Sequence, residues 1–114
     1  MAGYSHICTA PAAALRGRVL KNYNMKKFVI ERNLPGAGNL TPEELQVIAR
    51  TSNEVVAGLK EPYIWIQSFV TEDKIYCIHI AESEEVVREH AKRACFPINS
   101  VTEIKAVIDA TTAG

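Results

Sequence analysis

Two histidines, His79 and His90, are the residues of this chain with the widest range of chemistry. Imidazole nitrogens bind nickel, copper, zinc and iron, and they exchange protons near neutral pH. His79 lies near the end of an alternating apolar run, and His90 lies in the helical pattern that follows. If that helix folds back over the run, both side chains lie on the same side of a sheet. The pair predicts a metal or ligand site; the alternative is two semi-buried core histidines that hydrogen-bond to neighbours.

Two glutamates are the next candidates, because carboxylates act as hard-oxygen metal ligands or as general acids and bases. Glu31 and Glu103 fall on strands that we expect to be neighbours, with both side chains on one face of the sheet. Burial there would raise a carboxyl pKa and could poise one group for proton transfer. The alternative is a surface ion pair with Lys105 or Arg32, which would contribute little energy.

These side chains need a scaffold, and the apolar patterns along the chain predict one. Alternating apolar residues predict strands at 27–32, 63–71, 74–81 and 101–108, and the acidic turn Glu72-Asp73 makes the middle two a hairpin. Pairing across this turn is expected to place Phe69 opposite Tyr76, Gln67 opposite Ile78 and Trp65 opposite Ile80. Helical spacing predicts one helix between the first two strands and another between the last two. The order strand, helix, strand, strand, helix, strand is the α+β repeat of the ferredoxin-like fold, with a four-stranded antiparallel sheet.

Both helix starts carry capping signals. Thr41 is expected to cap the first helix, with Pro42 in the first helical position and Glu44 completing a capping box. Ser83 is expected to cap the second helix. The glycine-rich loop at residues 35–38 lacks the third glycine of a dinucleotide-binding loop and the lysine of a P-loop, so it predicts a turn.

Two helices cover only one face of a four-stranded sheet, so the other face is expected to be open. We predict an aliphatic set that faces the helices: Phe28, Ile30, Ile64, Ile66, Val70, Ile75, Cys77, Ile104 and Ile108. The open face would then hold a ligand pocket with polar and aromatic lining: Trp65, Gln67, Phe69, Tyr76 and Glu103. Because a large aromatic face is rarely bare on a monomer, two copies are expected to stack these faces as a homodimeric α/β barrel.

The distribution of charged residues indicates one domain with a basic N-terminal extension. The chain has 114 residues and a formal net charge of zero, which gives no support to nucleic-acid binding. Residues 1–24 carry Arg16, Arg18 and Lys21 without an acid, a charge of +3 that the rest of the chain balances. We expect a flexible basic extension over residues 1–24 and a ferredoxin-like domain over residues 25–114.

The cysteines and the hydropathy bear on location. Cys8, Cys77 and Cys95 are odd in number and have no CxxC spacing, which argues against a disulfide framework or a thiolate zinc site and favours a reducing compartment. No apolar run approaches the roughly 20 residues that a membrane span needs. These features predict a cytoplasmic protein without a membrane partner.

Three blocks of the sequence resemble a known family: MKKFVIERNLPGAGNLTPEEL, SFVTEDKIYCIHIA and REHAKRACFPINSVTEIKAVIDATTA. Their most specific pieces are ER-x-LPGAG, DKIYC, REHA, FP and VID-x-TTA. The stretch from Met25 to Ala113 is similar to a bacterial family of small nickel-binding proteins. The resemblance implies a ferredoxin-like fold, a dimeric α/β barrel and a nickel ion, with Glu31 and His90 as functional positions in the matching blocks. Together with His79 they form the predicted metal site.

The first hypothesis is therefore a homodimeric protein that binds nickel and buffers or senses it. A site of imidazole and carboxylate ligands would also take copper. The alternative is a cofactor-free monooxygenase, isomerase or lyase of the dimeric-barrel type, in which Glu31 or His79 is a general base beside Trp65, Phe69 and Tyr76. A third hypothesis is an accessory module whose open face binds another protein.

Overall fold

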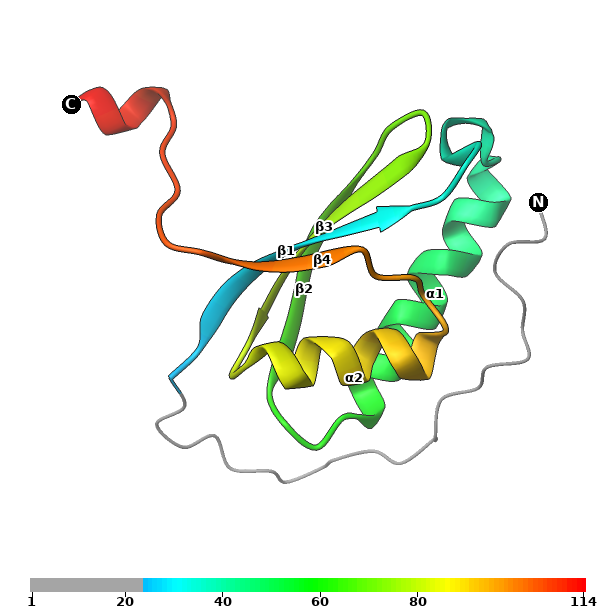
Figure 1. Ribbon diagram of the computed structural model, residues 1–114, viewed down its shortest axis with the longest axis horizontal. Helices are drawn as coiled ribbons and strands as arrows, with labels where there is room; N and C mark the ends of the chain where they lie inside the picture. The colour runs from blue at the N-terminus through cyan, green and yellow to red at the C-terminus, as the bar shows by residue number, and fades with distance from the viewer. Residues whose placement is uncertain (1–23) are drawn as a thin grey trace.

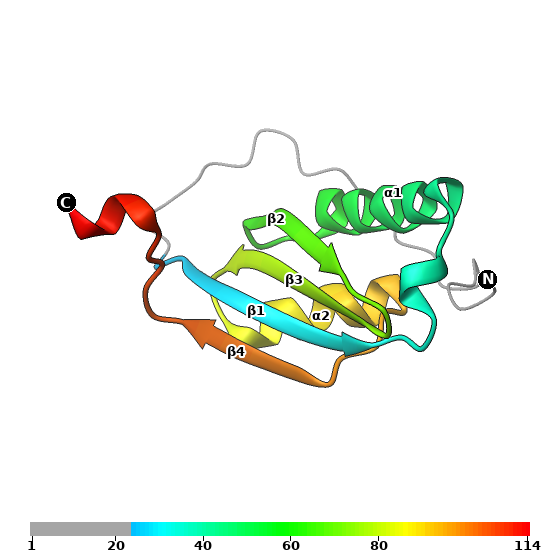
Figure 2. The same ribbon diagram turned by 90° about the horizontal axis from the view of Figure 1, so that it is seen from above.

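The computed structural model describes residues 24–114, which form a four-stranded antiparallel sheet with two α-helices. The elements, in chain order, are β1 (Lys26–Asn33), η1 (Ala37–Asn39), α1 (Pro42–Gly58), β2 (Tyr63–Val70), β3 (Lys74–Ala81), α2 (Glu84–Ala94), β4 (Ser100–Ile104) and η2 (Ala110–Ala113). Figure 1 labels these elements, and Figure 2 shows the strands side by side in the order β2-β3-β1-β4. This is the order of a ferredoxin-like fold and confirms the predicted α+β class with a four-stranded antiparallel sheet. The predicted basic extension lies outside the described residues except for Asn24.

Both helices lie on the same side of the sheet (Figure 2). The side chains that β1 and β3 turn toward them are buried: Phe28, Ile30, Arg32, Ile75, Cys77, His79 and Ala81. Alternate residues of the same strands, such as Val29 and Ile78, are only partly buried. The period-two pattern therefore gives one helix-covered face and one open face, as the sequence predicted.

The helices begin where their capping residues predicted. Thr41 Oγ1 accepts a hydrogen bond from the Glu44 amide (3.1 Å), and the Glu44 carboxylate accepts one from the Thr41 amide (3.0 Å). The two bonds form the expected capping box, with Pro42 in the first turn. Ser83 Oγ caps α2 by accepting from the Val86 amide.

The last strand is shorter than predicted. β4 ends at Ile104, which pairs with Lys27, the second residue of β1, so this ladder ends close to where β1 begins. The chain then leaves the sheet and ends in η2 (Figure 1). The prediction that Ile108 faces the helices is therefore wrong, and this side chain is exposed.

The glycine-rich loop between β1 and α1 is a turn, as predicted. Gly36 has a φ of 80°, a left-handed conformation that glycine adopts without a steric penalty. A Cβ at Gly38 would come within 3.1 Å of Glu72 Cα, because the loop packs directly on the hairpin turn. The amides of Gly36 and Gly38 donate to Asp73 Oδ1 and to the Glu72 carbonyl, each at 2.9 Å. These bonds occupy the amides that a phosphate would need.

A β-bulge in β2 places the side chains of the first half of this strand on the face opposite to the predicted one. The predicted pairs next to the hairpin turn are confirmed: Phe69 with Tyr76 and Gln67 with Ile78. The ladder then shifts by one residue at Ile66, so Trp65 pairs with His79 instead of Ile80. Trp65, predicted for the open face, therefore lies on the helix-covered face. Ile64 and Ile66, predicted to face the helices, are exposed.

The side chains of β4 also lie opposite to the prediction. Glu103 pairs with Phe28, and paired residues of antiparallel strands point to the same face, so Glu103 lies on the helix-covered side. Ile104 pairs with Lys27 and lies on the open face. The predictions that Glu103 faces an open-side pocket and that Ile104 faces the helices are both wrong. This short strand carries apolar residues at both parities, so its own pattern does not fix its face.

Two structural features bear on the predicted location. Cys77 is a free, buried thiol, whereas Cys95 is disulfide-bonded, which does not support the reducing compartment that the cysteine count favoured. Within residues 24–114, no helix is both long and apolar enough to span a membrane.

Candidate functional site

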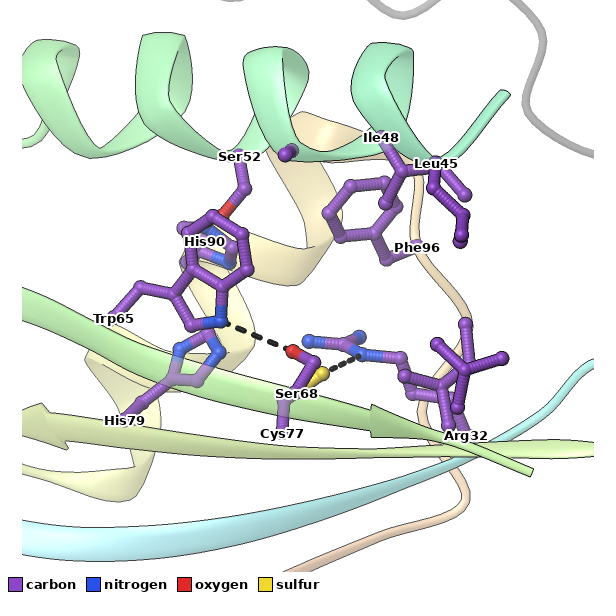
Figure 3. A pocket seen from close by; sticks show the side chains of 13 residues that line it. Arg32, Leu45, Ile48, Ser52, Trp65, Ser68, Cys77, His79, His90 and Phe96 are labelled. Carbon is purple, nitrogen blue, oxygen red and sulfur yellow. Dashed lines mark hydrogen bonds between the residues drawn. The ribbon is translucent and has the colours of Figure 1, made fainter. Parts of the chain in front are cut away.

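A cavity of about 240 Å³ lies between α1 and the helix-covered face (Figure 3). Its apolar wall comes from α1, the sheet and the segment after α2: Leu45, Ile48, Ala49, Val70, Ile75 and Phe96. Its polar groups come mostly from the sheet, with two from the helices: Arg32, Trp65, Ser68, Cys77, His79, Ser52 and His90. Leu45 and Val70 are exposed to solvent, so the cavity opens on their side.

His79 and His90 lie together in this wall, on the side of the sheet that the sequence predicted. Their rings are 5.1 Å apart between centroids and nearly perpendicular. Tyr63 contacts both, because its ring stacks on His90 at 4.9 Å and its hydroxyl hydrogen-bonds to His79 Nδ1. Ser52 Oγ, on α1, lies 3.1 Å from His90 Nε2. These four residues form a buried polar group, the histidine cluster, to which the sheet and both helices contribute.

Burial keeps both imidazoles of the histidine cluster neutral. It lowers the pKa of His79 to about 2, with the neighbouring His90 and Arg32 adding to the effect. Burial and then Arg32 lower the pKa of His90 to about 4, against an opposing effect of Ser52. Burial also raises the pKa of Tyr63. At neutral pH each imidazole therefore keeps one nitrogen lone pair free of a proton.

One nitrogen of the cluster lacks a partner. Among residues 24–114, His90 Nδ1 is the one buried side-chain nitrogen or oxygen without a hydrogen bond. Since the Ser52 hydroxyl can donate to Nε2 or accept from it, Nδ1 is either a free lone pair or an N–H donor. Buried polar atoms without a partner are rare in folded proteins, so this nitrogen marks a place where a ligand is expected.

Arg32 brings a full positive charge into the same cavity, although its side chain is only 2% exposed. Its Nε donates to Cys77 Sγ at 3.3 Å, and its Nη1 donates to the Pro97 carbonyl at 2.9 Å. The guanidinium carbon lies 5.2 Å from the centre of the Phe96 ring. No carboxylate in the described part of the chain pairs with it.

Glu31, the third residue of the predicted metal site, lies on the open face. Its carboxylate accepts a bond from Lys74 Nζ at 2.5 Å and lies 3.5 Å from Ser100 Oγ. The sheet separates this carboxylate from His79 and His90. The structure thus brings the two histidines together and leaves Glu31 apart from them.

The residues of the predicted open-face pocket are divided between the two faces. Trp65 lines the observed cavity and donates from Nε1 to Ser68 Oγ at 3.0 Å. The rest of the aromatic and amide set stays on the open face: Gln67, Phe69 and Tyr76. Glu103 pairs with the exposed Lys105 at 3.3 Å, which is the surface ion pair that the sequence offered as the alternative.

Sequence reasoning did not find three residues of the site. Arg32 follows Phe28 and Ile30 at the period of a strand, and this alternation alone could have placed it on the helix-covered face. Ser52 falls on the apolar stripe of α1, where a small polar residue suggests a buried hydrogen bond. Tyr63 lies on the helix-covered face because of the bulge in β2, and the local sequence has no glycine or other signal that predicts this bulge.

The comparisons with known proteins identify the family. The sequence profile of a family described as "Nickel responsive protein SCO4226-like" matches residues 28–104, from β1 to the end of β4. The chain belongs to this family. The match confirms the resemblance seen in the sequence and includes Arg32, His79 and His90. No curated protein matches the chain.

A solved structure shares the fold of this chain. The crystal structure of SCO4226 from Streptomyces coelicolor A3(2) matches with a TM-score of 0.62 and 19% sequence identity. The match covers 72% of this chain and 99% of that chain, so the shared unit is essentially the whole of the other protein. At this identity the likeness supports the fold alone.

Proposed function

We propose that this protein binds a nickel ion through His79 and His90 and serves in nickel buffering or sensing. The observation that carries the proposal is a buried pair of neutral imidazoles, one with an unpartnered Nδ1, in a chain of a nickel-responsive family. Neutral imidazole is the form that binds metal, and nickel is among the metals it suits. Ligands on β3 and α2 would let the bound ion hold these two elements together.

The histidine pair is an incomplete donor set. No group of three or more His, Cys, Asp or Glu side chains within residues 24–114 is placed to hold a metal. Water or an external ligand would therefore complete the coordination. Arg32 stands in the same cavity, and its charge repels a dication. We accordingly expect modest affinity, with copper as the strongest competitor among the divalent metals.

Glu31, which the sequence predicted as a metal ligand, lies too far from the histidine cluster to share its metal ion. It lies on the open face, where it already pairs with Lys74. A nickel site at Glu31 would thus be a second site rather than part of the histidine cluster.

The second part of the proposal is a homodimer that stacks two open faces as a dimeric α/β barrel. Ile64 and Phe69 are each 51% exposed there. Tyr76 and Ile78, partly buried, extend the same apolar surface across β3. An apolar surface of this kind is usually covered by a partner. A cytoplasmic location stays a prediction, and the disulfide at Cys95 does not support it.

The alternative of a cofactor-free enzyme has less support. Burial and neighbouring positive charge lower the pKa of His79 to about 2, which makes it a poor proton acceptor. Glu31, the other candidate base, lies on the opposite side of the sheet from Trp65 and the cavity.

The direct test is calorimetric titration of tag-free protein, stripped by a chelator, with nickel, zinc, cobalt and copper. We expect saturable nickel binding in the micromolar range at a defined ratio of metal to chain. Binding weaker than about 1 mM would mean that this chain does not use nickel directly.

Variants locate the site. His79→Phe and His90→Phe keep an aromatic ring in the core and should each weaken nickel binding by more than about tenfold. His6→Ala is the matched control, because it removes the third histidine of the chain, which lies outside the described residues. Loss of binding in His6→Ala alone would contradict the assignment to the histidine cluster. Circular dichroism should show that all three variants stay folded.

A further inference from the structure

Within residues 24–114, Arg32 is a buried charge without a counter-charge. Of the described residues that line the cavity, Arg32 is the one arginine, none is a lysine and none is an acid. Its bonds go to a thiol and a carbonyl, which are neutral acceptors. Burying an ion is costly unless another charge or several hydrogen bonds compensate it. Since nothing among residues 24–114 supplies that charge, the cavity is suited to an anion from outside.

The rest of the cavity wall indicates which chemical groups such an anion would have besides its charge. Beside Arg32, the cavity is bounded by aliphatic and aromatic side chains, among them Ile48, Ile75 and Phe96. An apolar cavity of about 150 Å³ is large enough for benzene. The 240 Å³ here therefore has room for one ring and a carboxylate. Phosphate or sulfate would leave most of the apolar wall without a contact.

We propose that this cavity binds a small aromatic monocarboxylate, with the carboxylate paired to Arg32 and the ring against the apolar wall. An Arg–carboxylate pair is short and directional, and burial strengthens it. Trp65 closes part of the same wall and would contact the ring.

The chain provides its own reporter for a test. Trp65 is its single tryptophan and lines the cavity, so its fluorescence should change when a ligand enters. The protein is titrated with sodium benzoate and, separately, with benzamide, which has nearly the same shape without the charge. We expect benzoate to bind with a Kd of about 1 mM or tighter. Benzamide should bind at least about tenfold more weakly, because a hydrogen bond to a charged group is the stronger kind.

Two variants distinguish the effect of the Arg32 charge from the effect of the cavity volume. Arg32→Gln should weaken benzoate by at least about tenfold and bring it close to benzamide. Arg50→Gln is the matched control, since Arg50 is exposed on α1 and outside the cavity wall. Ala49→Leu keeps the charge and fills part of the cavity, so it should weaken both ligands. It keeps the test informative if Arg32→Gln does not fold.

The outcomes also separate this proposal from nickel binding. Removing the Arg32 charge should not lower nickel affinity, because that charge only opposes a cation. Equal binding of benzoate and benzamide, unchanged benzoate binding in Arg32→Gln or Ala49→Leu, or no fluorescence response to benzoate would each overturn the carboxylate proposal. Each of these results would leave the nickel proposal standing, because nickel binding is measured in a separate titration of the wild type.

Discussion

The two faces of the sheet put neighbouring residues of the same strand into opposite environments. Glu31 and Arg32 are adjacent in β1 and both charged. Glu31 faces the open side, where Lys74 pairs with it and solvent reaches both side chains. Arg32 faces the helices, almost completely buried and without a carboxylate among residues 24–114. Solvent and Lys74 make the Glu31 charge inexpensive, whereas the buried Arg32 charge is the one for which we propose an anionic ligand.

The same contrast holds for the apolar side chains. Under the helices, Ile30 and Val87 are fully buried and fix the core. On the open face, Ile64 and Phe69 remain half exposed in one chain and are available to a partner. One face therefore stabilises the fold and holds the histidine cluster, while the other face is suited to assembly.

The largest difference between the faces should appear in stability. Ile30→Ala should lower the free energy of unfolding by about 2–5 kcal/mol, because it leaves a cavity in the core. The same deletion on the open face, Ile64→Ala, should cost less than about 1 kcal/mol. Urea unfolding at low protein concentration measures both. Equal losses would mean that the open face is as well packed as the core.

The buried histidines should make stability depend on pH. The folded-state pKa values of His79 and His90, about 2 and about 4, lie below their ordinary value of 6.5. Below pH 6.5 the unfolded chain therefore binds more protons than the folded chain, so stability falls as the pH falls. Between pH 7 and pH 5 the loss should be about 2 kcal/mol per histidine.

A matched variant isolates this effect. In His79→Phe/His90→Phe the pH dependence of urea unfolding over the same interval should be much weaker. A wild-type protein with equal stability at pH 7 and pH 5 would show that the two imidazoles titrate normally and are not buried.

A charge in the middle of the open face should break the dimer. Phe69→Glu places a carboxylate in the surface where two sheets are proposed to stack, and it should weaken association by about a hundredfold. Light scattering over a range of concentrations measures the change. Gln46→Glu, at an exposed position of α1, adds the same charge away from that face. A wild-type monomer, or an unchanged dimer in Phe69→Glu, would refute the stacked-sheet arrangement.

The smallest effect should come from the open-face ion pair. Glu31→Gln removes the partner of Lys74, and because both side chains are partly exposed the cost should be below about 1 kcal/mol. Nickel affinity at the histidine cluster should stay unchanged in calorimetric titration. A clear drop in that affinity would place Glu31 in the metal site.

Much of the fold is local enough to be predicted from the sequence. Thr41, Glu44 and Ser83 act on amides within one helical turn, so their caps follow from residue type and spacing. The hairpin turn fixes the register of the residues next to it, and Gly36 supplies a conformation that other residues rarely adopt. The order of the elements, and with it the ferredoxin-like class, follows from these local signals.

The site was only partly accessible from the sequence. The sequence predicted that His79 and His90 lie on the same side of the sheet, because strand and helix periodicity determine which way each side chain points, and the structure confirms it. The bulge at Ile66 moved Trp65 to the cavity, and the register of β4 moved Glu103 off the open face. A one-residue shift reverses a strand's faces, and its energy depends on packing against the whole sheet rather than on nearby residues.

Sequence alone therefore determined the elements, their order, the two histidines and the family. Tertiary structure decided which residues share a site. The burial of Arg32, with no carboxylate beside it in the described part of the chain, arises only when the hairpin, α1 and the segment after α2 enclose it together. Solvation, pKa and ligand preference depend on this enclosure, because the energy of a charge is set by all the atoms that exclude water from it.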